Sequence, residues 1–409
     1  MGDSIIKFVF LLALLASFIV NCNDFYTQRK NPFLNRSYKD IREIPYENND
    51  IEQLKEKLKA ESIYQINKKL VFKVQQHENI LQTDPSSPDF YKINGIIKYY
   101  DYDGNLKPGK NISVFVYKDQ KPISNTLTDD DGKWEIELNH KSFYKSKINI
   151  RFSMSNNYLE IKRLDYYYEW EILNIDSFEK DIYTGIITPD KTSENSKVGY
   201  IFEIFNRYLT FFKNEKIEIN SWWKYKIIVF WPHKYTWFGY ENGNIGISEA
   251  KRWDVIGHEI GHAVAYTGIH SPMSALSNHK VSQCYSEQLA WAEGIATFLS
   301  GVVNLKRNEP DTRFQYLFPR YLENVPDDVC PGQTNEWRVA AFMWDLYDLN
   351  NEGNDTVNLS FKKIWEPLIT HNKTINSLDD ALKIIKDNNS ELKEKELQSL
   401  MEYNKIYKK

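Results

Sequence analysis

The stretch that decides the fold is Gly257-His258-Glu259-Ile260-Gly261-His262, in a chain of 409 residues. Two histidines four positions apart lie on one face of a helix, one turn from each other. At that spacing a single zinc ion can bind both imidazoles, at about 2.0–2.1 Å. Apolar neighbours such as Ile256 and Val264 give this helix a face to bury. We therefore expect a buried, metal-binding helix with Asp254 as its N-cap.

Glu259 directly follows the first histidine and lies toward the expected metal. A carboxylate there can take a proton from a water molecule on zinc, because the metal lowers the pKa of that water toward about 7. The chain has only 8 histidines, so this spacing beside a glutamate would rarely arise by chance. The alternative is a helix with two ordinary surface or core histidines.

The His-Glu-x-x-His pattern resembles the signature of the zincins, a class of zinc peptidases. Residues 291–298, Trp-Ala-Glu-Gly-Ile-Ala-Thr-Phe, resemble the glutamate helix of the gluzincins, where Glu-Gly-x-Ala recurs and the glutamate is the third ligand. The resemblance implies that His258, His262 and Glu293 bind Zn2+ and that Glu259 is the catalytic base. It also implies a zincin-like fold and a peptide or protein substrate.

The residues themselves leave the third zinc ligand open. Glu293 lies among apolar residues such as Ile295 and Leu299, where a buried carboxylate needs a partner. A salt bridge would satisfy Glu293 as well as a metal would. The competing candidates for the third ligand are Glu287, His270 and His279.

Two supporting roles are open as well. A donor must stabilise the oxyanion that forms when a carbonyl is attacked. The candidate donors are Tyr266, His279, Tyr285 and Arg338. A helix predicted over residues 339–348 carries Asp345 and Asp348. Either aspartate would hydrogen-bond a zinc-ligating imidazole or act as an ordinary surface or capping residue.

The N-terminus indicates export. Lys7 precedes an apolar run over residues 8–20, which is too short to span a bilayer but has the length of a signal-peptide core. Residues 19–22, Ile-Val-Asn-Cys, resemble a relaxed bacterial lipobox. This implies a signal peptide over residues 1–21 and a membrane-anchored lipoprotein with lipid on Cys22. Plain secretion and a retained apolar tail are the alternatives.

Downstream, the chain predicts an α+β protein with three parts. Residues 22–89 read as a lead-in helix and linker. Residues 90–172 alternate short β-type runs with turn signals, which predicts a small antiparallel β-sandwich. Residues 173–409 mix helices and strands and contain the metal motif, as a zincin-like mixed α/β catalytic domain would. A short strand over residues 244–248 is expected to be the sheet edge on which a peptide substrate pairs.

The β-rich segment also resembles the transthyretin-like, carboxypeptidase-regulatory-like β-sandwich. The segments that carry the resemblance are Asn-Gly-Ile-Ile at 94–97, Lys-Pro-Gly-Lys-Asn-Ile at 107–112 and Thr-Asp-Asp-Asp-Gly-Lys-Trp at 128–134. The resemblance implies a structural or binding module without catalytic residues.

Charge and cysteine usage limit the remaining classes. A net charge of -4 lacks the basic footprint of a nucleic-acid-binding protein. Cys284 and Cys330 would form a disulfide in an exported protein or stay as two buried thiols.

We expect zinc-dependent hydrolysis of peptide bonds. The alternatives are a surface binding or adhesion protein that keeps a zincin fold without activity, and a zinc hydrolase of non-peptide amides. The sequence predicts neither cleavage preference nor oligomeric state.

Overall fold

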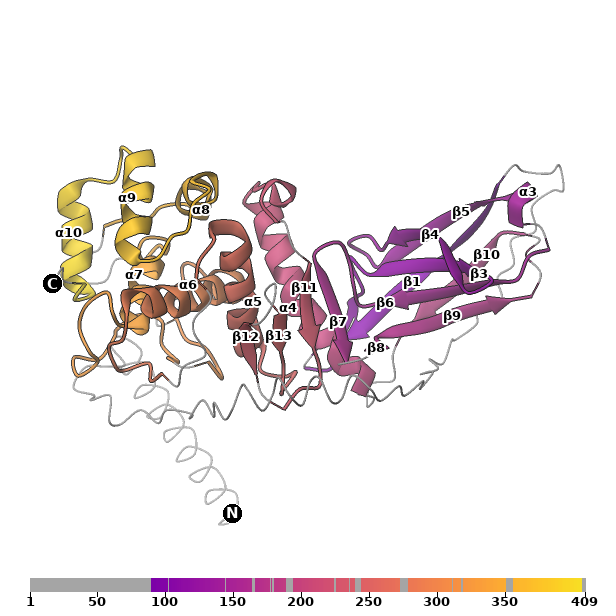
Figure 1. The fold of residues 1–409 in the computed structure, drawn as a ribbon, viewed down its shortest axis with the longest axis horizontal. Coiled ribbons are helices and arrows are strands. Elements are labelled where there is room, and N and C mark those ends of the chain that lie inside the picture. The colour runs from indigo at the N-terminus through magenta and orange to yellow at the C-terminus, as the bar shows by residue number, and fades with distance from the viewer. Residues whose placement is uncertain are drawn as a thin grey trace, which may run out of the picture. The chain divides into compact units, whose positions relative to one another are not determined.

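A computed structural model describes residues 90–406 of the chain. Excepted are residues 102, 144, 164–165, 177, 179, 189–193, 224–225, 235, 240–243, 273–278, 311, 318 and 351–355. The predicted signal peptide, Cys22 and the predicted lead-in helix lie outside the described residues. The described chain divides into two compact units (Figure 1). The N-terminal unit runs to Asn278 and includes residues 371–374, and the C-terminal unit holds residues 279–370 and those from 375 onward.

The first sheet of the N-terminal unit is built around β1 (Phe90–Tyr100). β1 pairs antiparallel with β2 (Leu106–Pro108) and with β5 (Lys133–Asn139). It pairs in parallel with β10 (Ile182–Ile187). The expectation of purely antiparallel pairing is therefore wrong for this sheet. It was based on residues 90–172, whereas the parallel partner comes from farther along the chain.

The second sheet is antiparallel throughout, in the order β4-β3-β6-β9. Its strands are β3 (Ser113–Lys118), β4 (Lys121–Leu127), β6 (Ile148–Ser153) and β9 (Glu169–Ile175). A short helix, α3 (His140–Phe143), follows β5. The short β-type runs expected within residues 90–172 are confirmed by strands β1, β3, β5 and β6. β4 was not predicted, because its polar sequence lacks the apolar alternation of a half-buried strand.

The third sheet has the order β12-β13-β11-β7-β8. Its strands are β7 (Leu159–Arg163), β8 (Tyr166–Tyr167), β11 (Ile227–Phe230), β12 (Trp237–Gly239) and β13 (Asn244–Gly246). β13 was expected to be the edge strand. That expectation is wrong, because β12 pairs with β13 on the side away from β11 and takes the edge itself.

Two long helices complete the N-terminal unit: α4 (Glu194–Asn214), which a 3-10 turn at Ile219–Ser221 follows, and α5 (Trp253–Ile269), which comes after β13. The predicted N-cap is wrong, because α5 begins two residues earlier than expected and its N-cap is Arg252. Asp254 instead lies in the first turn, where an acidic side chain favours the helix dipole.

The described part of the C-terminal unit consists of helices and connecting loops. The helices are α6 (Glu287–Asn304), α7 (Glu336–Asp345), α8 (Phe361–Thr370), α9 (Leu378–Asn388) and α10 (Glu394–Tyr403). α6 and α7 lie side by side (Figure 1). Ser286 and Asn335 cap these two helices, each accepting a hydrogen bond from a first-turn backbone N–H. The described chain is thus mixed α/β with several sheets, and no described helix is long and apolar enough to cross a membrane.

Candidate metal centre

The histidine pair of α5 lies in the interior of the N-terminal unit. His258 and His262 are each 6% exposed, and Glu259 is 1% exposed. The imidazole centroids are 4.5 Å apart with the rings nearly perpendicular, at 84°. Phe238 of β12 stacks on His262 at 5.2 Å with an interplanar angle of 8°. The helical repeat therefore gathers two imidazoles and a carboxylate in a buried place, and an aromatic side chain fixes the orientation of one ring.

The metal helix is also held by a buried tyrosine of α4. The Tyr208 hydroxyl donates a hydrogen bond of 2.6 Å to the backbone oxygen of Gly257, one residue before the first histidine. Burial raises the pKa of Tyr208 well above its ordinary value, so the hydroxyl keeps its proton and stays a donor. This contact ties the motif to α4, independently of any metal.

One competing ligand, His270, ends the helix. It is the C-cap of α5 in the left-handed conformation, with φ at 50°. Eight residues of helix place it about 12 Å along the axis from His262. His270 therefore terminates α5 at a distance that does not suit a third ligand on the same ion.

Glu293 lies in the middle of α6 in the C-terminal unit and is 6% exposed. The competing residue Glu287 lies in the first turn of the same helix and accepts a hydrogen bond of 3.0 Å from Gln333 Nε2. Six residues of helix separate the two glutamates by about 9 Å along the axis. Of the two, Glu293 is the buried carboxylate.

Gly294, the residue after Glu293, lies where α6 packs closely against α7. A Cβ added there would lie 2.6 Å from Val339 Cγ1 and 3.0 Å from the backbone oxygen of Glu336, both on α7. Glycine thus permits the close approach of α6 and α7. That approach brings the first residue of α7, Glu336, beside Glu293.

His279 completes this cluster. Its Nε2 lies 3.7 Å from Glu293 Oε2 and 3.3 Å from Glu336 Oε2. The three form a His/Glu group that could hold a metal ion, all within the C-terminal unit. Sequence reasoning missed Glu336. The only local signal is its place directly after the N-cap Asn335, where an acidic residue is ordinary.

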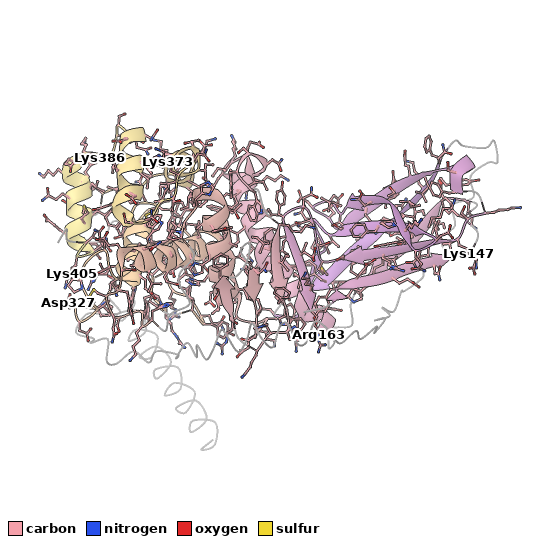
Figure 2. The ribbon with its side chains drawn as sticks, in the orientation of Figure 1. Lys147, Arg163, Asp327, Lys373, Lys386 and Lys405 are labelled. Atoms are coloured by element: carbon pink, nitrogen blue, oxygen red, sulfur yellow. A yellow bond between two sulfur atoms is a disulfide. The ribbon has the colours of Figure 1, made fainter. Side chains whose placement is uncertain are left out.

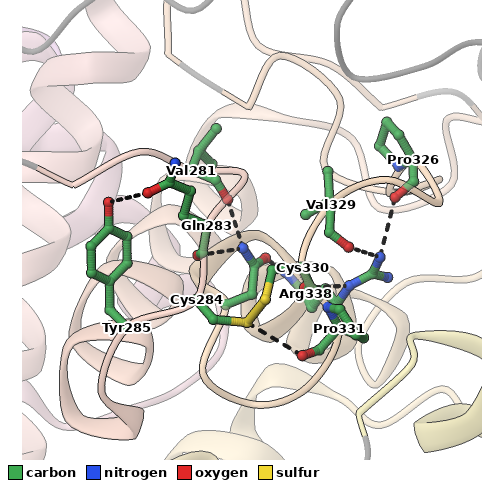
Figure 3. Close-up of a disulfide and its surroundings, with 10 residues drawn as sticks. Val281, Gln283, Cys284, Tyr285, Pro326, Val329, Cys330, Pro331 and Arg338 are labelled. Carbon is green, nitrogen blue, oxygen red and sulfur yellow. Dashed lines mark hydrogen bonds between the residues drawn. A yellow bond between two sulfur atoms is a disulfide. The ribbon is translucent and has the colours of Figure 1, made fainter.

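The loop that carries His279 is fastened at several points. Cys284 and Cys330 form a disulfide with their Cα atoms 5.6 Å apart (Figure 3), which decides between the bond and the free thiols. Asn335 Nδ2 donates to the backbone oxygens of Val281 and Gln283. The Tyr285 hydroxyl accepts a hydrogen bond of 2.8 Å from the backbone N–H of Lys280.

Arg338, a candidate oxyanion donor, has a structural role. Its buried guanidinium donates to the backbone oxygens of four residues (three of them labelled in Figure 3). They are Pro326, Val329, Cys330 and Asn404. Arg338 therefore binds the loop around Cys330 to the end of α10.

The two aspartates near the end of α7 also have partners in the C-terminal unit. Asp345 accepts a hydrogen bond of 2.6 Å from Asn404 Nδ2, and Asp348 accepts one from the backbone N–H of Asn350. These contacts favour the structural interpretation of both residues.

At the surface, Asp327 and Lys405 (both labelled in Figure 2) form an ion pair, and the hydrogen bond from Lys405 lowers the pKa of Asp327.

Comparison with known proteins supports a peptidase-related protein. Residues 223–392, which include both α5 and α6, match the family described as Mycolysin C-terminal domain, a domain associated with peptidases. No curated protein matches the chain. Among solved structures, a 9R-lipoxygenase from Cyanothece PCC8801 is similar over 41% of this chain and 28% of its own, with 13% identity. The TM-score of that match is 0.18, too low to indicate a shared fold.

Proposed function

We propose that this protein hydrolyses peptide bonds with a zinc ion held by His258, His262 and Glu293, and with Glu259 as the base. The observation that carries the proposal is that Glu259 is buried next to His258 in a helix whose single turn sets the two imidazoles side by side. The burial of Glu293 and a peptidase-associated family match that includes both helices add support.

The donor set suits zinc. Two imidazoles and a carboxylate are a frequent ligand set of catalytic zinc, and they leave a fourth position open. A carboxylate as buried as Glu293 would be costly without a cation or a donor to compensate its charge. When bound, zinc would polarise the substrate carbonyl and lower the pKa of a coordinated water.

Glu259 would move the proton. Its carboxylate takes a proton from the attacking water as the new C–O bond forms. It then passes that proton to the amine nitrogen as the C–N bond breaks. Burial suits this role, because a carboxylate shielded from solvent exchanges its proton with the reacting groups rather than with bulk water.

The edge strand β12 is our proposed place for substrate. A peptide that pairs with its outer edge would add a strand to the sheet, and main-chain hydrogen bonds would hold it. Phe238, in the middle of β12, contacts His262 directly, so a peptide on this edge would run close to the metal helix.

The N-terminal segments would determine where the protein is located and how it reaches its substrate. We propose that Cys22 carries a lipid anchor on an exported protein, and that the β-rich segment is a transthyretin-like β-sandwich that positions substrate or attaches the enzyme to a surface. Palmitate labelling checks the anchor: the wild-type protein should take up label and Cys22→Ala should not. Label that persists in Cys22→Ala, or an unlabelled wild type, would remove this part of the proposal.

The test of catalysis is Glu259→Gln, which keeps the size of the side chain and removes the base. We expect kcat on a peptide library to fall by about 10²–10⁴-fold, the usual contribution of a general base, with zinc content unchanged. Glu249→Gln is the matched control. Glu249 is exposed and forms an ion pair with Arg252, the N-cap of α5, so it lies outside the motif. This control should keep the wild-type kcat.

The same variants separate the alternatives. A surface binding protein would show no peptide turnover, and Glu259→Gln would leave its zinc content and binding unchanged. A hydrolase of non-peptide amides would be inactive on peptides but would turn over acylated amines, and that turnover would depend on Glu259. Peptide turnover that Glu259→Gln leaves intact would refute the assigned base.

A further inference from the structure

We propose a second metal site in the C-terminal unit, formed by His279, Glu293 and Glu336, for a divalent transition-metal ion such as zinc. The three ligand atoms all lie within 4.8 Å of one another. They come from the loop before α6, from the middle of α6 and from the start of α7. The site thus depends on the close packing of α6 and α7 at Gly294.

The spacing of the ligand atoms fits a metal better than direct hydrogen bonds. His279 Nε2 is 3.3 Å from one carboxylate oxygen and 3.7 Å from the other. An N–H···O hydrogen bond is usually about 2.7–3.2 Å long. Two ligands at about 2.0–2.2 Å from a tetrahedral zinc lie about 3.3–3.6 Å apart. The separation of 3.3 Å falls within this range and that of 3.7 Å lies just above it, so both are close to the edges of a tetrahedron around one ion.

The charge of the cluster also calls for a cation. The side chains of Glu293 and Glu336 are 8% and 11% exposed, and that of His279 is 15% exposed. Two carboxylates this close in a site of low polarity repel each other strongly. A divalent ion next to both carboxylates would offset the two charges. A nitrogen donor with two carboxylate oxygens suits zinc or manganese.

Glu293 is also the third zinc ligand that the proposed function assigns. The site of His279, Glu293 and Glu336 does not rest on that assignment, because all three residues lie together in the C-terminal unit.

Metal content tests the proposal. The purified full chain would be loaded with excess Zn2+, dialysed and measured by elemental analysis. We expect about two ions per chain in the wild type and about one in Glu336→Gln, which keeps the side-chain shape. His279→Asn should also hold about one. Glu287→Gln is the matched control on the first turn of α6 and should keep both. Circular dichroism would verify that each variant folds.

The outcomes distinguish this site from the proposed function. One ion that survives Glu336→Gln and is lost in His258→Ala would overturn the second site and leave the proposed function intact. One ion lost in Glu336→Gln and retained in His258→Ala would support the second site and refute the zinc of the proposed function.

Discussion

The metal helix α5 and the His279–Glu293–Glu336 cluster each bring histidine and glutamate side chains together, but by different means. His258, Glu259 and His262 lie within a single turn and a half of one helix, so the helical repeat alone sets their spacing. The members of the cluster come from three separate segments of the C-terminal unit. Their spacing depends on how a loop and two helices pack. Local sequence therefore fixes the first group, and tertiary contacts fix the second.

Because of this difference, the two groups should respond differently to mutation. A change far from α5 in sequence leaves the spacing of its histidines unaltered as long as the helix forms. A change that loosens the loop before α6 or moves α7 should disturb the cluster directly. Three substitutions outside both groups test this contrast, in order of decreasing expected effect on stability.

The largest effect is expected for Arg338→Met. The substitution leaves four buried backbone oxygens without their guanidinium donor, around Cys330 and at the end of α10. Removing a buried charged partner of this kind costs about 3–5 kcal/mol. We expect the free energy of unfolding, measured by urea titration, to fall by that amount. The metal of the cluster should also be lost more readily on dialysis.

Arg338→Lys is the control for charge. Lysine keeps the positive charge but lacks the planar fork that bonds several oxygens at once. Its loss of stability should lie between those of the wild type and Arg338→Met. If Arg338→Met were as stable as the wild type, the loop would not depend on this side chain and the contrast between the two groups would weaken.

The same contrast explains how much the sequence could predict. The α5 motif, its burial and Glu293 could be predicted from spacing and apolar flanks, because those features are local. Glu336 could not, because an acidic residue at a helix start is ordinary and only the packing of α7 on α6 brings its carboxylate near His279 and Glu293. The N-cap of α5 was misplaced by a local ambiguity, since Asp254 is as acceptable in the first turn as before it.

The sheets show the same difference between features set by local sequence and features set by tertiary contacts. Strands with apolar alternation, such as β5, can be expected from the sequence, because the alternation marks one buried face. The polar strand β4 is held by pairing with β3, and the parallel partner β10 joins β1 from far along the chain. The edge of the third sheet was assigned to β13 because that strand directly precedes the metal helix. Which strand lies outside β13 depends on the antiparallel pairing of β12 with β13, a tertiary contact.

A smaller effect is expected for Gly294→Ala, which tests the packing of the cluster. The added methyl group would collide with Val339 and approach the backbone of Glu336. Overpacking costs about 1–3 kcal/mol, partly offset by the better helix propensity of alanine. Stability should fall, and α7 should shift away from α6. Metal analysis should then show weaker binding at the cluster.

Val339→Ala provides the control for this steric reading, because it removes the nearest atom, Val339 Cγ1. The double variant should be more stable than the sum of the two single changes predicts, by about 1 kcal/mol. Additive single effects would mean that Gly294 is required for a reason other than contact with α7.

The smallest effect is expected for Tyr208→Phe, which tests the side-chain hydrogen bond from α4 to the backbone of Gly257 in the motif helix. Losing it should cost about 0.5–1.5 kcal/mol while the histidine spacing and metal content stay unchanged, since helix geometry sets them. The pH dependence gives a second check. Burial raises the pKa of Tyr208, so its contribution should be constant below the ordinary tyrosine pKa of about 10 and should fall only above it. If Tyr208→Phe instead released the metal at neutral pH, α5 would depend on tertiary contacts as much as the cluster does.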